Sequence, residues 1–391
     1  MMRTVGSASS ASKDRGLINR IGWLVVLPIL LGASPWERPR TPVIDAKALG
    51  VTGLKASDCA TCHPAVASEW STSIHAAAWT DPQFQAELHK DAEVGWLCLN
   101  CHTPIANQQQ QLVTDGENIR SPTTVLNVDF DASFRSEGVS CLACHWRAEG
   151  IATARSDVRA PHPTVHDPEL GGDQTCTVCH QATARLEDAL VCHFNTGVEK
   201  ASAGVTQSCT DCHMPAVKRG ERHGRLHSWP GSGIGKGERP PPPGLDGLDL
   251  EGPTVGADGE LRFALINARA GHMLPTGDPE RYLEVSAELL DKEGGLTDSR
   301  RWRIGQTWVW SPKAEKRADN RLAVGERRPF TWALKAEGAV VRLKVEHVRL
   351  SPENLDYHLK LLASGHPGPS AKALKAYPTR RILFERTAAI R

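Results

Sequence analysis

The pattern of apolar and polar positions changes at about residue 255. Beyond that point, apolar and polar residues alternate in L-R-F-A-L-I-N, Y-L-E-V-S-A-E-L-L, T-W-V-W, R-P-F-T-W-A-L and V-V-R-L-K-V-E-H-V. A period of two is typical of half-buried strands, and turn sequences such as D-K-E-G-G separate these segments. The pattern predicts an antiparallel β-sandwich domain over residues 256–391, with a helix at about 352–364 and a last strand at R-I-L-F-E.

The first 33 residues have the pattern of a signal peptide. Four basic residues precede a short apolar run at 21–31, and small residues follow it. The run is shorter than the ~18 apolar residues of a membrane-spanning helix, and it contains Pro28. We therefore expect a periplasmic or extracellular protein, with no transmembrane helix in the mature chain and an extended leader at residues 34–54.

Composition adds a domain boundary. Residues 231–255 are rich in Gly and Pro and include four consecutive prolines at 240–243, which predicts a linker. Residues 55–230 hold many Cys, His and Pro but few large apolar side chains, so they predict a domain of mostly short helices and loops. Lys and Arg number 46 against 45 Asp and Glu, and this balance gives no support to a nucleic-acid partner.

Ten of the eleven cysteines fall into five copies of the pattern C-x-x-C-H, whose first cysteines are 39, 43, 35 and 33 residues apart. Two thiols one helical turn apart can each form a thioether to a haem, and the following imidazole can reach the iron. A single C-x-x-C is also compatible with a redox dithiol or half of a zinc site, but five copies favour haem. The predicted attachment cysteines are Cys59, Cys62, Cys98, Cys101, Cys141, Cys144, Cys176, Cys179, Cys209 and Cys212, and the predicted proximal ligands are His63, His102, His145, His180 and His213. The expected cofactor is haem c, five copies covalently attached, and their porphyrins would fill a core that lacks aromatic side chains.

Several longer segments resemble the multihaem cytochrome c families related to cytochrome c554. They are C-A-T-C-H-P-A-V-A-S-E-W-S-T-S-I-H, C-L-N-C-H-T-P-I-A-N-Q, G-V-S-C-L-A-C-H, A-P-H-P-T-V and C-T-D-C-H-M-P followed by H-S-W-P-G, over about residues 55–235. The resemblance implies closely spaced haems that pass electrons along a stack.

The iron of an electron-transfer haem needs a second strong ligand, commonly His or Met. Two of the four methionines lie in the signal peptide, so bis-histidine ligation is expected. The resemblance implies a distal ligand at His75, on a helix, and another at His227, with His223 as its rival. It also points to His162 in A-P-H-P, with His166 able to replace it.

The loop A-G-H-M-L-P-T-G-D resembles a G-H-x-x-P-T-G loop that accompanies multihaem domains of this group. On that resemblance, His272 would ligate a haem of the first domain. The alternative is a demanding turn within which His272 is hydrogen-bonded. Three further histidines, His347, His358 and His366, are expected on the surface.

The pair Cys192-His193 has Ala189 where a motif would have its first cysteine. A sixth haem held by one thioether is not expected here. By resemblance, this segment is a helix that connects the fourth and fifth motifs. His193 is therefore either a distal ligand or an ordinary helix residue beside a buried thiol.

The preferred function is respiratory electron transfer between redox partners, such as other cytochromes or a quinol-linked membrane complex. An oxidoreductase acting on nitrogen or sulfur oxyanions at one open haem iron is the alternative. The motif C-x-x-C-K is absent, and all three tyrosines lie beyond residue 256. These two absences favour a carrier over a catalyst, and we assign no catalytic residue. A conducting filament is disfavoured because candidate distal histidines are plentiful.

Overall fold

The computed structural model describes residues 42–186, 190–220, 222–237, 241–310, 312–335 and 338–390. The predicted signal peptide, the first part of the predicted leader, Ala189 and Pro240 lie outside these ranges. The described residues all belong to one compact unit.

Residues 42–54 differ from the extended leader expected from the sequence. Ile44 and Leu49 are buried in an apolar cluster with Ile105 and Phe134. The Asn107 side chain accepts a hydrogen bond from the Ile44 amide at 2.8 Å and donates one to the Ile44 carbonyl at 3.1 Å. The leader is held because it supplies both apolar side chains and backbone partners to the region that follows.

The part of the chain before residue 231 is built from short helices. Four of them end at the histidine of a C-x-x-C-H motif, and prolines follow two of these ends at Pro104 and Pro215, where no helix can continue easily. The helices are α1 Ala56–Ala60, α2 Pro64–Ser71, α3 Pro82–Lys90, α4 Gly95–His102, α5 Ala132–Arg135, α6 Leu142–His145, α7 Asp173–His180, α8 Thr196–Ser202 and α9 Cys209–His213, with a 3₁₀ turn at Ala106–Gln108.

This part also contains small sheets that the sequence analysis did not predict. Their strands are β1 Gln111–Asp115, β2 Thr123–Leu126, β3 Trp146–Arg147, β4 Gly150–Thr153, β5 Thr164–His166, β6 Gln181–Arg185, β7 Leu190–Asn195, β8 Ala216–Arg219 and β9 Arg222–Arg225. The segment around Cys192 is therefore strand β7, paired with β6, and the expected connecting helix is wrong. The physical reason is a period of two in β6, where Ala182 and Ala184 are buried and the residues between them are not.

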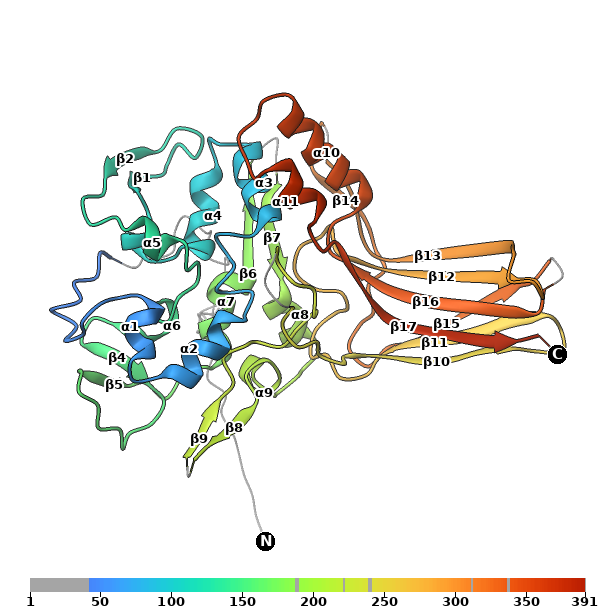
Figure 1. Ribbon diagram of the computed structural model, residues 1–391, viewed down its shortest axis with the longest axis horizontal. Coiled ribbons are helices and arrows are strands. Elements are labelled where there is room, and N and C mark those ends of the chain that lie inside the picture. Colours follow the sequence, from blue (N-terminus) through green and yellow to red (C-terminus); the bar gives the residue numbers. More distant parts are fainter. Residues whose placement is uncertain are drawn as a thin grey trace, which may run out of the picture. The chain divides into compact units, whose positions relative to one another are not determined.

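Two antiparallel sheets dominate the chain from residue 248 onward (Figure 1). One has the order β10-β11-β15, with β10 Leu248–Val255, β11 Glu260–Asn267 and β15 Arg327–Ala333. The other has the order β14-β13-β12-β16-β17, with β12 Tyr282–Leu290, β13 Leu296–Val309, β14 Glu315–Asp319, β16 Val340–Val348 and β17 Arg380–Ala389. Helices α10 Pro352–Ala363 and α11 Ala371–Lys375 lie between the last two strands in sequence.

Apolar side chains from both sheets form one core. Leu261 and Leu265 of β11 are fully buried against Val285 and Leu289 of β12 and Leu343 of β16. Strand β10 begins inside the stretch expected to be a linker, because L-D-L-E also alternates and its two leucines join this core. Within the described ranges, no helix is long and apolar enough to cross a membrane.

Candidate cofactor site

A branched cavity of about 3330 Å³ runs among the short helices and reaches the β-rich part. All ten motif cysteines and all five motif histidines line it. A pocket for one drug-sized ligand is about 300–1,000 Å³, so this space fits several large groups. All eleven cysteines are described and none forms a disulfide, which leaves the ten motif thiols available for thioether bonds.

The motifs present these thiols from helical turns. In the first motif, the Cys62 and His63 amides donate to the Cys59 carbonyl at 3.2 and 2.9 Å. In the third, the His145 amide donates to the Cys141 carbonyl at 3.1 Å. Residues three apart on a helix lie on the same face, so each pair of thiols can meet one edge of a planar ring.

Three motif histidines face a second imidazole at similar spacings. The ring centres are 6.2 Å apart for His180 and His75, 6.4 Å for His145 and His227, and 6.3 Å for His213 and His272. An imidazole nitrogen binds a transition metal at about 2.0 Å and lies about 1.1 Å from its ring centre, so two imidazoles across one metal would have centres about 6.2 Å apart. The spacing of all three pairs fits an iron between the rings.

Hydrogen bonds at Nδ1 fix the orientation of many of these rings. A carbonyl oxygen can only accept, so each of these Nδ1 atoms carries the proton and leaves Nε2 as the metal-binding nitrogen. The bonds are His102 to Ala78 at 2.9 Å, His145 to Ala152 at 2.8 Å, His213 to Pro230 at 2.7 Å, His227 to Arg225 at 2.8 Å and His272 to Met273 at 3.0 Å.

Burial keeps the rings uncharged. Burial, together with the nearby His180, lowers the pKa of His75 to about 3. Burial, together with Lys236, lowers the pKa of His102 to about 4, and burial with His213 lowers that of His180 to about 4. Only the neutral imidazole has a free lone pair for a metal, so these rings are ready to act as ligands near pH 7.

The first of the predicted distal ligands, His75, lies in a turn rather than on the helix that the resemblance implied. Helix α2 ends at Ser71, and the Ser73 hydroxyl then accepts a hydrogen bond from the Ala76 amide at 3.2 Å. The His75 carbonyl accepts a hydrogen bond from the Val139 amide at 3.0 Å, which ties this turn to the third motif.

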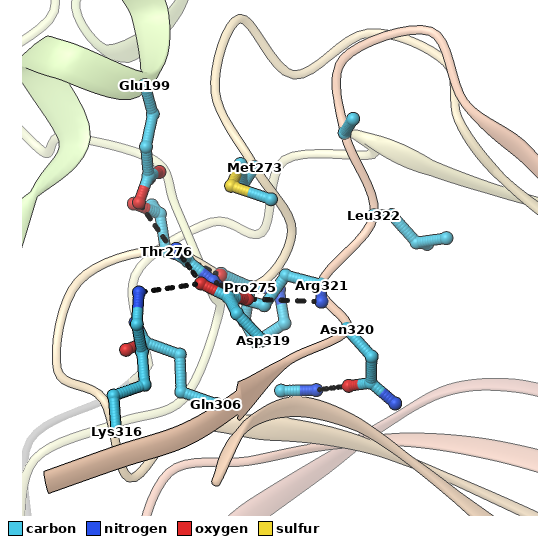
Figure 2. Close-up of polar contacts among 12 residues, drawn as sticks. Glu199, Met273, Pro275, Thr276, Gln306, Lys316, Asp319, Asn320, Arg321 and Leu322 are labelled. Carbon is cyan, nitrogen blue, oxygen red and sulfur yellow. Dashed lines mark hydrogen bonds and ion pairs between the residues drawn. The ribbon is translucent and has the colours of Figure 1, made fainter. Parts of the chain in front are cut away.

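His272 reaches the cavity from a loop of the β-rich part. Figure 2 shows Thr276 and Pro275 of this loop beside Glu199 of α8 and Arg321. The hydroxyls of Thr276 and Thr196 are 2.8 Å apart. The loop therefore contacts the helix that precedes the fifth motif in sequence, and it brings His272 to His213.

The remaining predicted ligands have different surroundings. His162 is half-buried and lines the cavity, whereas His166 is exposed at the end of β5. His193 lines the cavity from β7, its Nδ1 is 2.9 Å from the Thr183 hydroxyl, and its ring lies edge-on to Trp308. His223, the rival of His227, also lines the cavity.

Of the histidines expected on the surface, His358 is buried and His347 is half-buried. His358 is only 2% exposed, and its Nε2 lies 2.8 Å from the Glu87 carboxylate. His347 lines the cavity, and burial lowers its pKa to about 3. The alternation in β16 was the missed signal, because His347 is in phase with the buried Val345.

The cavity also has polar walls that suit a group with carboxylates. The buried nitrogens Arg281 Nε, His347 Nε2 and Arg349 Nε have no hydrogen-bond partner within the described residues, and all three residues line the cavity. A haem carries two carboxylate side chains, so both the thiols and these nitrogens fit it. In the same cavity lining, burial and the nearby Asp278 raise the pKa of Glu280 to about 8.

Comparisons with known proteins agree with this geometry. Residues 58–146 match the family described as cytochrome c554 and c-prime. Among curated protein sequences, none matches the chain. The fold is similar to that of a solved penta-haem cytochrome c552 from Thermochromatium tepidum, with a TM-score of 0.60 and 18% identity over 86% of this chain and 99% of that one.

The segment match contains the first three C-x-x-C-H motifs, and the shared fold extends over most of the described chain. Residues 58–146 are therefore similar to the cytochrome c554 and c-prime family, and the fold of the chain is that of a multihaem cytochrome c.

Proposed function

We propose that the protein is an exported multihaem c-type cytochrome that transfers electrons along five covalently bound haems. Residues 55–230 would form the cytochrome domain and residues 256–391 a β-sandwich domain that covers it. The ten motif cysteines hold the haems through thioethers, and the five motif histidines are their proximal ligands. The bound haems supply irons that take up and release one electron each.

One observation carries this proposal: three motif histidines each face a second imidazole at the spacing that an iron would require. We assign His75 opposite His180, His227 opposite His145, and His272 opposite His213. Two strong ligands on one iron leave no position for a substrate, which suits a carrier.

The other two sites are assigned less fully. For His63 we propose His162 as the distal ligand, because it lines the same cavity, with His166 as the alternative. His193 remains a candidate ligand, although its hydrogen bond to Thr183 and its contact with Trp308 support a place in the protein interior. A sixth haem at Cys192 forms no part of the proposal.

The proposed location is the periplasm or the extracellular side, where c-type cytochromes meet their partners. The partners would be other cytochromes or a quinol-linked membrane complex, and not nucleic acid.

A second function is favoured by the surroundings of His102. Among the described residues, no imidazole pairs with His102 at the spacing seen for the other three, and its ring stacks on Phe84 at 3.7 Å. Glu280 lines the same cavity and holds a proton near neutral pH, because burial and the nearby Asp278 raise its pKa to about 8. An oxidoreductase needs such an open position and such proton donors.

Electron paramagnetic resonance of the oxidised holoprotein separates the two functions. A carrier with five doubly ligated haems gives only low-spin ferric signals, whereas an open site gives a high-spin signal from one haem in five. His75→Ala should create one high-spin haem. His89→Ala is the matched control, because the Nδ1 atom of His89 donates to the Gln85 carbonyl of its own helix at 2.7 Å. A substantial high-spin signal in the unaltered protein would overturn the carrier proposal.

A further inference from the structure

An ion pair between Glu199 and Arg321 has no role in the function proposed so far. Glu199 lies on α8, between the fourth and fifth motifs, and Arg321 follows β14. Their charged groups are 2.5 Å apart, and the two side chains are 4% and 5% exposed. Removing two charges from water costs desolvation free energy, so the burial of this pair needs an explanation.

Both members of the pair also hold the loop that carries His272 (Figure 2). Glu199 accepts a hydrogen bond from the Thr276 hydroxyl at 2.7 Å, and the Arg321 guanidinium donates to the Pro275 carbonyl at 3.4 Å. Asp319 accepts two further bonds from Arg321 at 2.9 Å each, which orients the guanidinium. The ion pair therefore fixes two consecutive loop residues.

The other side of the loop is anchored to the β-rich part. The Asn267 side-chain amide donates to the His272 carbonyl at 2.9 Å. The backbones of Leu274 and Leu322 exchange two hydrogen bonds, at 3.0 and 2.9 Å. His272 is anchored at its own carbonyl, and the next residues of the loop are held by Leu322 and by the ion pair, so its backbone has little freedom to move.

A second series of contacts links the ion pair to the partner imidazole. Lys200, the residue after Glu199, forms an ion pair with Asp173 at 2.6 Å. Asp173 also accepts a hydrogen bond at 2.9 Å from the Cys209 amide, at the start of the helix that ends in His213. These contacts, together with the chain link between Glu199 and Lys200, connect the loop that carries His272 to the helix that ends in His213.

We propose that Glu199 and Arg321 are positioning residues that hold His272 at ligand distance from the iron bound by His213. The inference rests on the proposed function, because it takes His272 as the distal ligand of that haem. It adds that coordination of the fifth haem depends on a buried charge pair that joins the cytochrome part to the β-rich part.

The test measures the spin state of the oxidised holoprotein by electron paramagnetic resonance in four variants. His272→Ala removes the ligand and should convert one haem in five to high spin. Glu199→Gln and Arg321→Gln should each convert a substantial part of the same haem. Glu288→Gln removes one member of the half-exposed Glu288–Arg342 pair at 2.7 Å and should change nothing.

Added imidazole should restore the low-spin signal in His272→Ala, Glu199→Gln and Arg321→Gln. A circular dichroism spectrum equal to that of the parent shows that each variant is folded. If Glu199→Gln does not accumulate, Thr276→Val makes the same test with a smaller expected fraction, because it removes the contacts of the Thr276 hydroxyl with Glu199 and Thr196 and leaves the ion pair intact.

Failure of the ligand assignment and failure of the positioning role give different results. If His272→Ala remains entirely low-spin, the ligand assignment of the proposed function is wrong. If His272→Ala gains a high-spin haem while the folded ion-pair and Thr276 variants stay low-spin, the positioning role is overturned and the ligand assignment stands.

Discussion

One buried side chain in the cavity wall, Glu280, carries a proton that an ordinary carboxylate would release. Glu280 lies near Asp278 and Glu87, with Lys90 as a nearby cation and Asn354 as a hydrogen-bonding neighbour. Burial and the two carboxylates oppose its ionisation, and they outweigh the attraction of Lys90, so the pKa rises to about 8. Glu280 is therefore neutral near pH 7 in the folded protein.

The raised pKa of Glu280 predicts a loss of stability as the pH rises. The unfolded chain releases this proton at about pH 4.3, whereas the folded chain keeps it up to about pH 8. Between these values the unfolded state binds fewer protons, so the free energy of unfolding falls with increasing pH. Glu280→Gln should make this fall shallower and leave the variant more stable than the parent at pH 8.

Urea denaturation at several pH values between 5 and 8 measures this slope. Glu288→Gln is the control, because Glu288 lies on strand β12 with a half-exposed side chain. This variant should keep the slope of the parent. An unchanged slope in Glu280→Gln would mean that Glu280 ionises normally in the folded protein.

Among the elements, the strands of the β-rich part were the easiest to predict. The segments Y-L-E-V-S-A-E-L-L and V-V-R-L-K-V-E-H-V coincide with β12 and β16, because each has one face in a single apolar core and alternates accordingly. The helix predicted at about 352–364 is found as α10 at Pro352–Ala363.

Elements near the cavity were harder to predict, since their burial is set by a group that is not an amino acid. The resemblance placed both the segment of strand β7 and His75 on helices, and the local patterns there are too short and weak to correct it. The motif cysteines and histidines could be read from spacing alone. The three imidazole pairs could not, because each joins residues far apart in sequence.

The core shared by the two sheets makes a prediction at the scale of these elements. Leu343 of β16 is fully buried in it, so Leu343→Ala should lower the free energy of unfolding by about 2–5 kcal/mol. Ile382 of β17 is 49% exposed, and Ile382→Ala should change it by less than about 0.5 kcal/mol. Urea denaturation followed by circular dichroism measures both values. If the two substitutions lowered the free energy of unfolding equally, the side chains assigned to the buried and exposed faces of the sheet would be wrong.

Over the whole molecule, the two parts of the chain are joined by buried polar contacts. His358 of α10 meets Glu87 of α3 at 2.8 Å, and the Tyr377 hydroxyl meets the Gln83 side chain at 3.3 Å. Together with the loop that carries His272, these contacts make the β-rich part a wall of the cavity. With His272 as the proposed ligand, the β-rich part would complete the haem site of His213.

The intact mass of the mature holoprotein tests the central claim most directly, with the start of the chain fixed by N-terminal sequencing. We expect the mass of the polypeptide plus five haems, both for the natural sequence and for Cys192→Ser. A mass with six haems, with fewer than five, or with one haem lost in Cys192→Ser would contradict it.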